Sequence, residues 1–129
     1  MRKQYHLRAS EDGGPGRDAW DVDSLIELTV GLPIVQVLIE DLDEIDTPYW
    51  FEHQKPPTVR QVVEHFRLLQ AVDPSCPIIV GPDGRILDGM HRVARRLLEG
   101  RTTVAAVRLP ELPPPDYRDC HPDDLPYER

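Results

Sequence analysis

The stretch that decides the fold is IIVGPDGRILDGMHRVARRLLEG, residues 78–100. A short β-branched run at 78–80 is followed by Gly-Pro-Asp-Gly at 81–84, where proline presets φ and the last glycine is free to take a positive φ. A second apolar run, 85–88, then returns. The pattern predicts a β-hairpin that leads directly into a helix, and Gly100 is typical of the residue that follows a helix end.

The start of this helix gathers the residues that an anion site needs. His91 and Arg92 place two potential cations where the helix dipole already carries partial positive charge, which costs about 0.3–1 kcal/mol each unless a negative group lies nearby. A basic helix N-terminus is suited to a phosphate or a carboxylate. Two other roles stay open: Asp88 has the character of a helix N-cap, and His91 and Arg92 could pair with Asp83 or Asp88.

Hydrophobic periodicity predicts the other elements. A short helix begins after Asp21 and ends at Gly31, a mostly buried strand covers 34–39, and another strand covers 102–109. A second helix begins at Thr58, which has the capping-box spacing to Gln61. Its apolar positions recur at helical spacing and are Val59, Val62, Val63, Phe66 and Leu69. Together these elements predict an α+β fold with a small mixed sheet and about three helices.

The two ends of the chain differ in composition from its middle. Residues 1–20 include the polar, glycine-rich run 9–18 and are predicted to be a flexible N-terminal arm. Residues 110–129 contain six of the 14 prolines and are predicted to be an extended, partly wrapped, proline-rich C-terminal tail. Residues 21–109 are expected to form the folded domain between them.

Charge and composition narrow the function. The formal net charge of −8 argues against binding duplex DNA, because such binding depends on neutralising phosphates. Residues 85–101 nevertheless hold five arginines against Asp88 and Glu99, a balance of +3 that leaves −11 for the remainder. A small basic patch on an acidic body fits a small anionic ligand. The two cysteines lack metal or redox spacing, and no signal peptide or membrane-spanning run is visible, so we expect a cytoplasmic protein without a membrane partner.

The order PIIV, a turn glycine, ILDG and then His-Arg at a helix start resembles the ParB/sulfiredoxin superfamily. The resemblance extends from Pro77 to Leu109, and the preceding helix lies where such domains usually have one. Within the superfamily, the string Asp-Gly-Met-His-Arg at 88–92 is most similar to free serine kinase-like members and to ParB-like nuclease-type domains. The fold that the resemblance implies is the small ParB/sulfiredoxin domain.

The resemblance also implies a ligand and roles for the residues of this motif. The ligand is a nucleotide, ATP, ADP or CTP with Mg²⁺, whose phosphates rest on the helix start. Gly89 then allows close approach of the backbone, and Met90 lies at the edge of the site. His91 donates a hydrogen bond and Arg92 pairs with phosphate oxygens. In the serine kinase-like members the motif aspartate, which corresponds to Asp88, contributes to catalysis.

Departures from the family pattern limit this reading. Sulfiredoxins have a cysteine before the His-Arg pair, where this chain has Met90, so we do not expect repair of a sulfinic acid. Chromosome-partitioning members carry a GERR-like string at this place and further DNA-reading and dimerisation domains, which we do not expect here. The second acidic residue of the free serine kinases is not recognisable in the sequence.

Two functions therefore compete. One is a nucleotide- or phosphate-binding domain that acts as a small-molecule phosphotransferase. The other is a non-catalytic, regulatory ParB-like module that binds a protein partner through the proline-rich tail.

Three further groups of residues are secondary candidates for the site. The acidic run 40–46 could bind Mg²⁺ or form solvated surface. Tyr49 and Trp50 could stack on a base or anchor the core, and His53 and His65 are weak candidates for acid–base groups.

Overall fold

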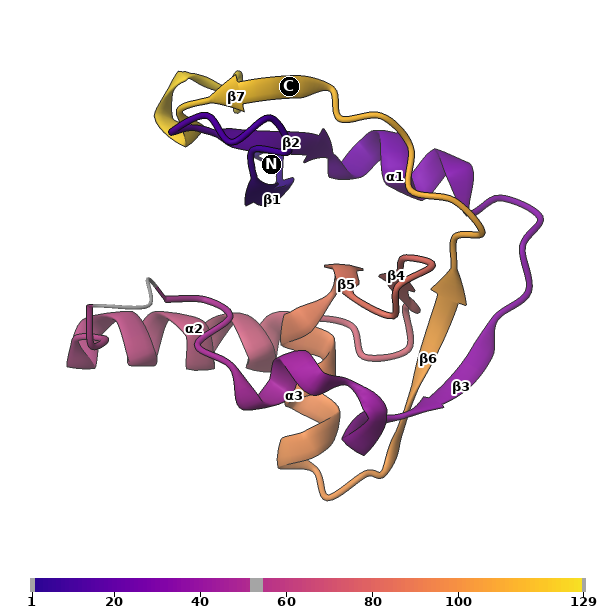
Figure 1. Cartoon of the computed structure of the whole chain (residues 1–129). Helices are drawn as coiled ribbons and strands as arrows, with labels where there is room; N and C mark the ends of the chain where they lie inside the picture. The colour runs from indigo at the N-terminus through magenta and orange to yellow at the C-terminus, as the bar shows by residue number, and fades with distance from the viewer. Residues whose placement is uncertain (1, 52–54, 129) are drawn as a thin grey trace.

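The computed structural model describes residues 2–51 and 55–128. In chain order the elements are β1 (Tyr5–Ala9), β2 (Arg17–Asp21), α1 (Val22–Leu28), β3 (Val35–Leu38), η1 (Ile39–Asp41), η2 (Asp43–Asp46), α2 (Val59–Ala71), β4 (Ile78–Val80), β5 (Ile86–Asp88), α3 (Met90–Leu98), β6 (Thr103–Arg108), β7 (Tyr117–Cys120) and η3 (Pro122–Asp124). The strands form one three-stranded and one four-stranded sheet. The predicted α+β class with a small mixed sheet and three α-helices is confirmed (Figure 1).

The four-stranded sheet has the order β3-β6-β4-β5. Its central pair, β4 and β6, is parallel, with Ile78 opposite Ala106, and the two outer pairs are antiparallel. The predicted hairpin is formed by β4 and β5. Its turn is closed by the Gly84 N–H, which donates to the Gly81 carbonyl at 3.0 Å, and Gly84 has the expected positive φ of 79°.

Both faces of this sheet are packed, because successive side chains of a strand point to opposite faces. One core lies on the side of α3 and the 3₁₀ helices and consists of Ile39, Leu42, Ile78, Val80, Ile86, Met90, Val93, Val104 and Ala106. The other joins the sheet to α1 and β2 and consists of Trp20, Leu25, Ile79, Leu87 and Leu109. The strand β4 therefore contributes to both cores, which explains why all three of its residues are buried.

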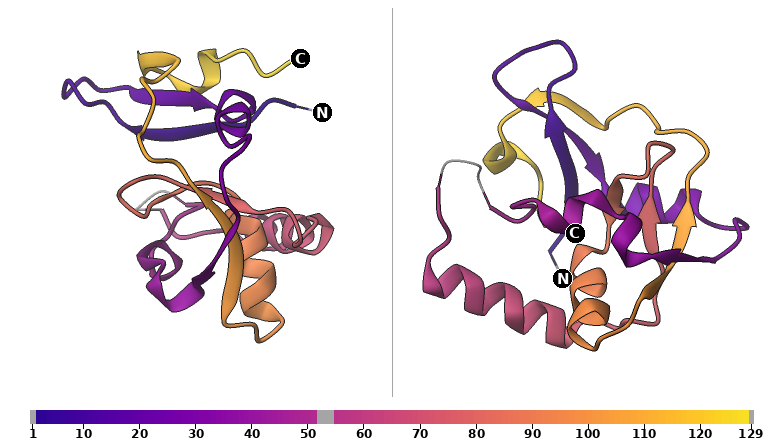
Figure 2. Two further views of the ribbon diagram at one scale, coloured as in Figure 1. Left: turned by 90° about the vertical axis from the view of Figure 1, so that its right-hand side faces the viewer. Right: turned by 60° about the horizontal axis from the view of Figure 1, so that its bottom comes forward.

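The two ends of the chain form the three-stranded sheet, in the order β1-β2-β7. Leu7 lies opposite Ala19 in the β1–β2 pair, and Arg17 lies opposite Cys120 in the β2–β7 pair. Figure 2 shows this sheet at one end of the molecule, with α2 and α3 at the other. The prediction of a flexible arm over 1–20 is thus wrong for β1 and β2, because main-chain pairing orders them. The tail over 110–129, predicted to be extended and partly wrapped, contributes the extended strand β7 to this sheet.

The strand predicted over 34–39 is present as β3, but it is not mostly buried. It lies at an edge of the four-stranded sheet, and Val35, Gln36 and Leu38 are exposed. The helix predicted after Asp21 is present as α1, and the Asp21 carboxylate caps it by accepting from the Asp23 N–H at 2.9 Å. A run of apolar residues thus marks a strand correctly without fixing its position in the sheet.

The second predicted helix is confirmed as α2, including its capping box. Thr58 accepts from the Gln61 N–H at 3.2 Å, and the Gln61 side chain accepts from the Thr58 N–H at 2.9 Å. Its apolar stripe, however, is largely uncovered: Val59 is 82% exposed, whereas Leu69 is 8% exposed. The helix meets α3 near its C-terminal end and extends away from the sheets (Figure 1).

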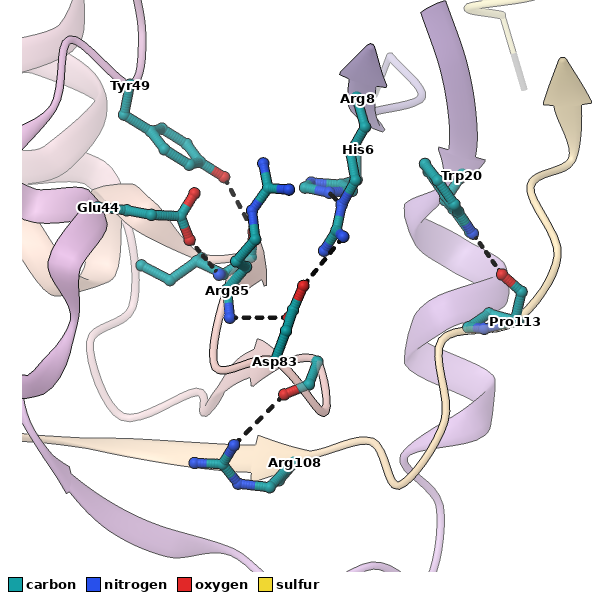
Figure 3. A network of polar contacts seen from close by, with 11 residues as sticks. His6, Arg8, Trp20, Glu44, Tyr49, Asp83, Arg85, Arg108 and Pro113 are labelled. Carbon is teal, nitrogen blue, oxygen red and sulfur yellow. Dashed lines mark hydrogen bonds and ion pairs between the residues drawn. The ribbon is translucent and has the colours of Figure 1, made fainter. Parts of the chain in front are cut away.

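Polar contacts hold the β4–β5 hairpin from outside (Figure 3). Arg8 of β1 donates to the Asp83 carboxylate at 3.1 Å, which joins the N-terminal hairpin to the turn. On the edge strand β5, Ile86 has both of its outward backbone groups paired with side chains. Its N–H donates to Glu44 at 2.5 Å, and its carbonyl accepts from the Tyr49 hydroxyl at 3.2 Å. These contacts satisfy an edge that would otherwise be open to pairing.

Candidate functional site

The expected site begins at Gly89, which is the N-cap of α3. Gly89 has a φ of 107°, in the left-handed region, and an ideal Cβ at this position would lie 2.7 Å from Ile78 Cγ2. Only glycine fits this close approach without strain. The interpretation of Asp88 as the N-cap is therefore wrong, because α3 has no side-chain cap and begins one residue after the expected position.

Asp88 and Arg92 face each other one helical turn apart. The Arg92 guanidinium donates through Nη1 to the Pro77 carbonyl at 2.7 Å and through Nη2 to the Asp88 carboxylate at 3.3 Å. The Asp88 side chain is 11% exposed. The pairing of Arg92 with Asp88, one of the alternatives drawn from the sequence, is confirmed, so the guanidinium already has an internal anion beside it.

The other arginines of α3 also bind backbone carbonyls, one in the last turn of α2 and one in the segment that follows it. Arg95 Nη1 donates to the Gln70 carbonyl at 2.6 Å, and Arg96 Nη2 donates to the Pro74 carbonyl at 3.2 Å. The last carbonyls of an α-helix have no partner within the helix, and cations near them are favourable. Much of the basic character of residues 85–101 therefore attaches α3 to its neighbour.

His91 lies in a stack with two residues from other segments. Its Nε2 and the Nδ1 of His65 on α2 are 2.9 Å apart, a hydrogen bond that needs one proton between them. The Trp50 ring is stacked on both imidazoles, with centroid distances of 4.6 Å to His65 and 4.5 Å to His91. This His65–Trp50–His91 stack joins α2, α3 and the aromatic segment that precedes α2.

The stack favours neutral imidazoles. Burial, and then the adjacent His65 ring, lower the pKa of His91 to about 4. Burial also lowers the pKa of His65. At neutral pH His91 therefore acts as a hydrogen-bonding group and not as a cation, so it adds no positive charge to the start of α3.

An open cavity of about 310 Å³ lies beside this stack. Its wall is mostly apolar and comprises Glu44, Ile45, Thr47, Pro48, Tyr49, Trp50, Phe51, Met90, Val93, Ala94 and Leu97. Met90 is the first residue of α3, and Trp50 also belongs to the stack, so the cavity adjoins the expected site. A cavity of this size with aromatic walls and few polar groups suits a planar small-molecule group.

Two secondary candidates have structural roles. Glu44, from the acidic run 40–46, caps the β5 edge, and no group of three or more His, Cys, Asp or Glu side chains is placed to hold a metal ion in residues 2–51 and 55–128. Tyr49 and Trp50 pack against the core on the α3 side, which confirms them as anchors. Burial raises the pKa of Tyr49 to about 12, so it remains a hydrogen-bond donor.

The structure thus places the five motif residues together but not as one basic pocket. Asp88 and Arg92 pair with each other, Gly89 makes the turn, Met90 enters the core and lines the cavity, and His91 joins the stack. Sequence reasoning rated His65 as a weak candidate and did not pair it with His91. His65 and His91 are 26 positions apart, and no local sequence pattern predicts a contact over that separation. His53, the other weak candidate, lies outside the described residues.

Comparisons of the chain with protein-family models, with curated proteins and with solved structures found no match. The resemblance to the ParB/sulfiredoxin superfamily therefore stays a prediction. In the part of the chain that the structure describes, no helix has the length and apolar character needed to cross a membrane.

Proposed function

We propose that this chain is a ParB/sulfiredoxin-like domain that binds a nucleotide or another phosphorylated small ligand at the start of α3. The cavity of about 310 Å³ carries the proposal, because Met90 and Trp50 connect its apolar wall to the helix start. The planar base of ATP, ADP or CTP enters the cavity against the aromatic residues. Its phosphates lie at the first turn of α3, where backbone N–H groups lack partners within the helix.

In the proposed complex, Arg92 exchanges its contact to Asp88 for a contact to the ligand phosphate. Its 2.7 Å bond to the Pro77 carbonyl is retained and keeps the guanidinium in position, whereas its longer 3.3 Å contact to Asp88 is replaced by a phosphate oxygen. The exchange releases the Asp88 carboxylate beside the phosphate. In a phosphotransferase that carboxylate would help to orient the acceptor or a Mg²⁺ ion. In a non-catalytic module the exchange would serve binding alone.

Binding can be measured by isothermal titration calorimetry with ATP, ADP and CTP, each with and without Mg²⁺. Ala94 lines the cavity, so Ala94→Leu reduces the space for the base and should lower affinity by about tenfold or more. Ala71→Leu, at an exposed position near the C-terminus of α2, makes the same chemical change outside the cavity and should have no effect. Absence of nucleotide binding in the wild-type chain, or equal affinity in both variants, would contradict the proposal.

Turnover is tested separately from binding. If Asp88 is the catalytic carboxylate, Asp88→Asn should abolish nucleotide-dependent phosphate release or transfer while nucleotide binding persists. Binding without any turnover in the wild-type chain would favour the regulatory module.

The regulatory alternative is favoured by a specific observation, namely the exposed apolar stripe of α2. Val59, Val63 and Phe66 lie on this stripe and are all exposed. The proline-rich tail, from which a docking role was expected, is instead bound within the molecule, since the Pro113 carbonyl accepts from Trp20 Nε1 at 2.7 Å. A regulatory module would therefore contact its protein partner through α2. Val63→Glu should then abolish partner capture and leave nucleotide binding unchanged.

A further inference from the structure

A second basic site lies at the opposite end of α3 from the predicted one. A polar depression of about 450 Å³ is lined by Gln36, Ser75, Arg96, Arg101, Thr103 and Ala105. It shares no residue with the aromatic cavity. Among the described residues that line it, two are arginines and none is an aspartate or glutamate. In a chain with a net charge of −8, this is an unusual local composition.

The floor of the depression is part of the four-stranded sheet. Gln36 of β3 lies opposite Ala105 of β6, and Thr103 is two residues away from Ala105 on the same strand. These three side chains therefore share one face. Ile79 of β4 lies on the same face of the sheet. Around Ile79, Trp20 and Leu25 of the second core cover this face. At the β3 edge of this face Gln36 is exposed, so the polar end of the face remains open.

Backbone hydrogen bonds at the end of α3 fix the main chain that carries Arg96 and Arg101. Gly100, with a φ of 75°, donates its N–H to the Leu97 carbonyl at 3.0 Å, and the Arg101 N–H donates to the Arg96 carbonyl at 2.9 Å. These two bonds form a Schellman motif, which fixes the backbone at the helix end. Arg96 is further held by its bond to the Pro74 carbonyl at 3.2 Å.

The groups around the depression leave donors available. The guanidinium of Arg101 has no hydrogen bond or ion pair within the described part of the chain, and neither does the side chain of Gln36 or Thr103. Arg96 is partly neutralised by Glu99, 3.5 Å away, and the Ser75 hydroxyl donates to Asp73 at 2.6 Å. The strongest free donor is therefore the Arg101 guanidinium, supported by the amide of Gln36 and the hydroxyl of Thr103. Charged and neutral donors that line one depression suit an oxyanion.

We propose that this depression binds a tetrahedral oxyanion, either free phosphate or the phosphoryl group of a small molecule, through Arg101 with Arg96, Gln36 and Thr103. The site is distinct from the nucleotide site proposed above. Because it is open and solvated, its affinity for phosphate alone is modest, and its contribution is to hold a charged group at the β3 edge of the sheet.

The test is a titration of the full chain with inorganic phosphate, followed by ¹H–¹⁵N correlation spectra at constant ionic strength. We expect saturable shifts of the amide signals at Gln36, Arg101, Thr103 and Ala105. Arg101→Ala should weaken phosphate binding by about fivefold or more, in keeping with the loss of one charge-assisted contact. Arg60→Ala removes an exposed arginine of α2 and is the control for the change in net charge. Gln36→Glu, which adds a carboxylate to an exposed strand position, should also abolish the shifts.

Additional titrations distinguish free phosphate from a phosphorylated small molecule as the ligand, and they distinguish this depression from the nucleotide site. Binding of glycerol phosphate but not of inorganic phosphate would support the site and identify a phosphoryl group on a small molecule as its ligand. Equal binding of acetate would overturn the tetrahedral preference. Shifts confined to residues 89–92 would support the nucleotide site and overturn this one. Shifts that do not saturate, or that are equally reduced by Arg60→Ala and Arg101→Ala, would overturn it as well.

Discussion

At the scale of single residues, Gly89 and Arg92 show how the motif supports the fold. Gly89 allows the chain to pass against Ile78 in the core, and Arg92 binds the Pro77 carbonyl that precedes the same strand. Both therefore fix the start of α3 to β4. The sequence identified the correct turn but assigned the N-cap to Asp88, because a carboxylate is a common N-cap and a left-handed glycine leaves no comparable local signature.

A glycine substitution tests this close approach. Gly89→Ala should lower the free energy of unfolding by about 2–5 kcal/mol, because the added Cβ meets Ile78 and the backbone is left-handed. Gly84→Ala is the matched control, since Gly84 has a φ of 79° but no atom within 4 Å of the added Cβ. It should cost about 1 kcal/mol. Both values can be obtained from urea denaturation, and similar losses in the two variants would contradict the steric argument.

The role of Arg92 in stability can be separated from its role in ligand binding. Without ligand, Arg92→Ala should destabilise the protein by about 1–3 kcal/mol, because the Asp88 carboxylate and the Pro77 carbonyl lose their donor. Arg92→Lys keeps the charge but cannot reproduce both contacts, so it should recover only part of the loss. Unchanged stability of Arg92→Ala would show that the guanidinium is free and available to a ligand alone.

Buried His6 and partly buried His91 predict a dependence of stability on pH. Burial, and then Arg8, lower the pKa of His6 to about 4, and burial with the His65 ring lowers that of His91 to about 4, from an ordinary 6.5. The unfolded chain therefore takes up protons more readily than the folded chain between these values. Stability is expected to be full above pH 6.5 and to fall as the pH is lowered towards 4. Denaturation measured across this range should show a shallower fall for His91→Asn, and an identical slope would contradict the assignment.

At the scale of elements, local sequence rules were reliable where local contacts decide the structure. The β4–β5 hairpin and the capping box of α2 depend on residues within a few positions of each other, and both were predicted. The position of β3 at a sheet edge and the exposure of α2 depend on what packs against them. The His65–Trp50–His91 stack likewise requires three distant segments to meet, which no periodicity encodes.

The uneven burial of α2 gives a second stability test. Leu69→Ala should cost about 2–4 kcal/mol, because Leu69 is the buried residue of this helix. Val59→Ala, at the exposed end of the same stripe, should change stability by no more than about 0.5 kcal/mol. If Val59→Ala became destabilising only as the protein concentration was raised, the stripe would be buried in an assembly.

At the scale of the whole molecule, the two ends of the chain complete the fold. The β7 strand covers one edge of β2, and the Pro113 carbonyl binds the Trp20 indole that lies in the second core. The sequence predicted an extended, partly wrapped tail here but did not identify the strand with which the tail pairs. The pairing partners are far apart in sequence, and nothing local to 117–120 identifies β2 as the neighbour.

Truncation tests this dependence. Deletion of residues 110–129 should abolish cooperative unfolding and expose Trp20 to water, which can be followed by its fluorescence. Deletion of 121–129 alone removes η3 but keeps β7, so it should leave a folded protein with a smaller loss of stability. A cooperative transition of full size in the longer deletion would show that the three-stranded sheet is dispensable.

The pairing of Arg17 with Cys120 also bears on the route by which the chain folds. Their positions lie 103 residues apart, and closing a flexible loop of that length costs about 4 kcal/mol of chain entropy before any contact compensates for it. The β4–β5 hairpin closes over a few residues and carries almost none of this cost. Refolding should therefore begin around the hairpin and α3, and the strand nearest the C-terminus should join in the final, slowest step.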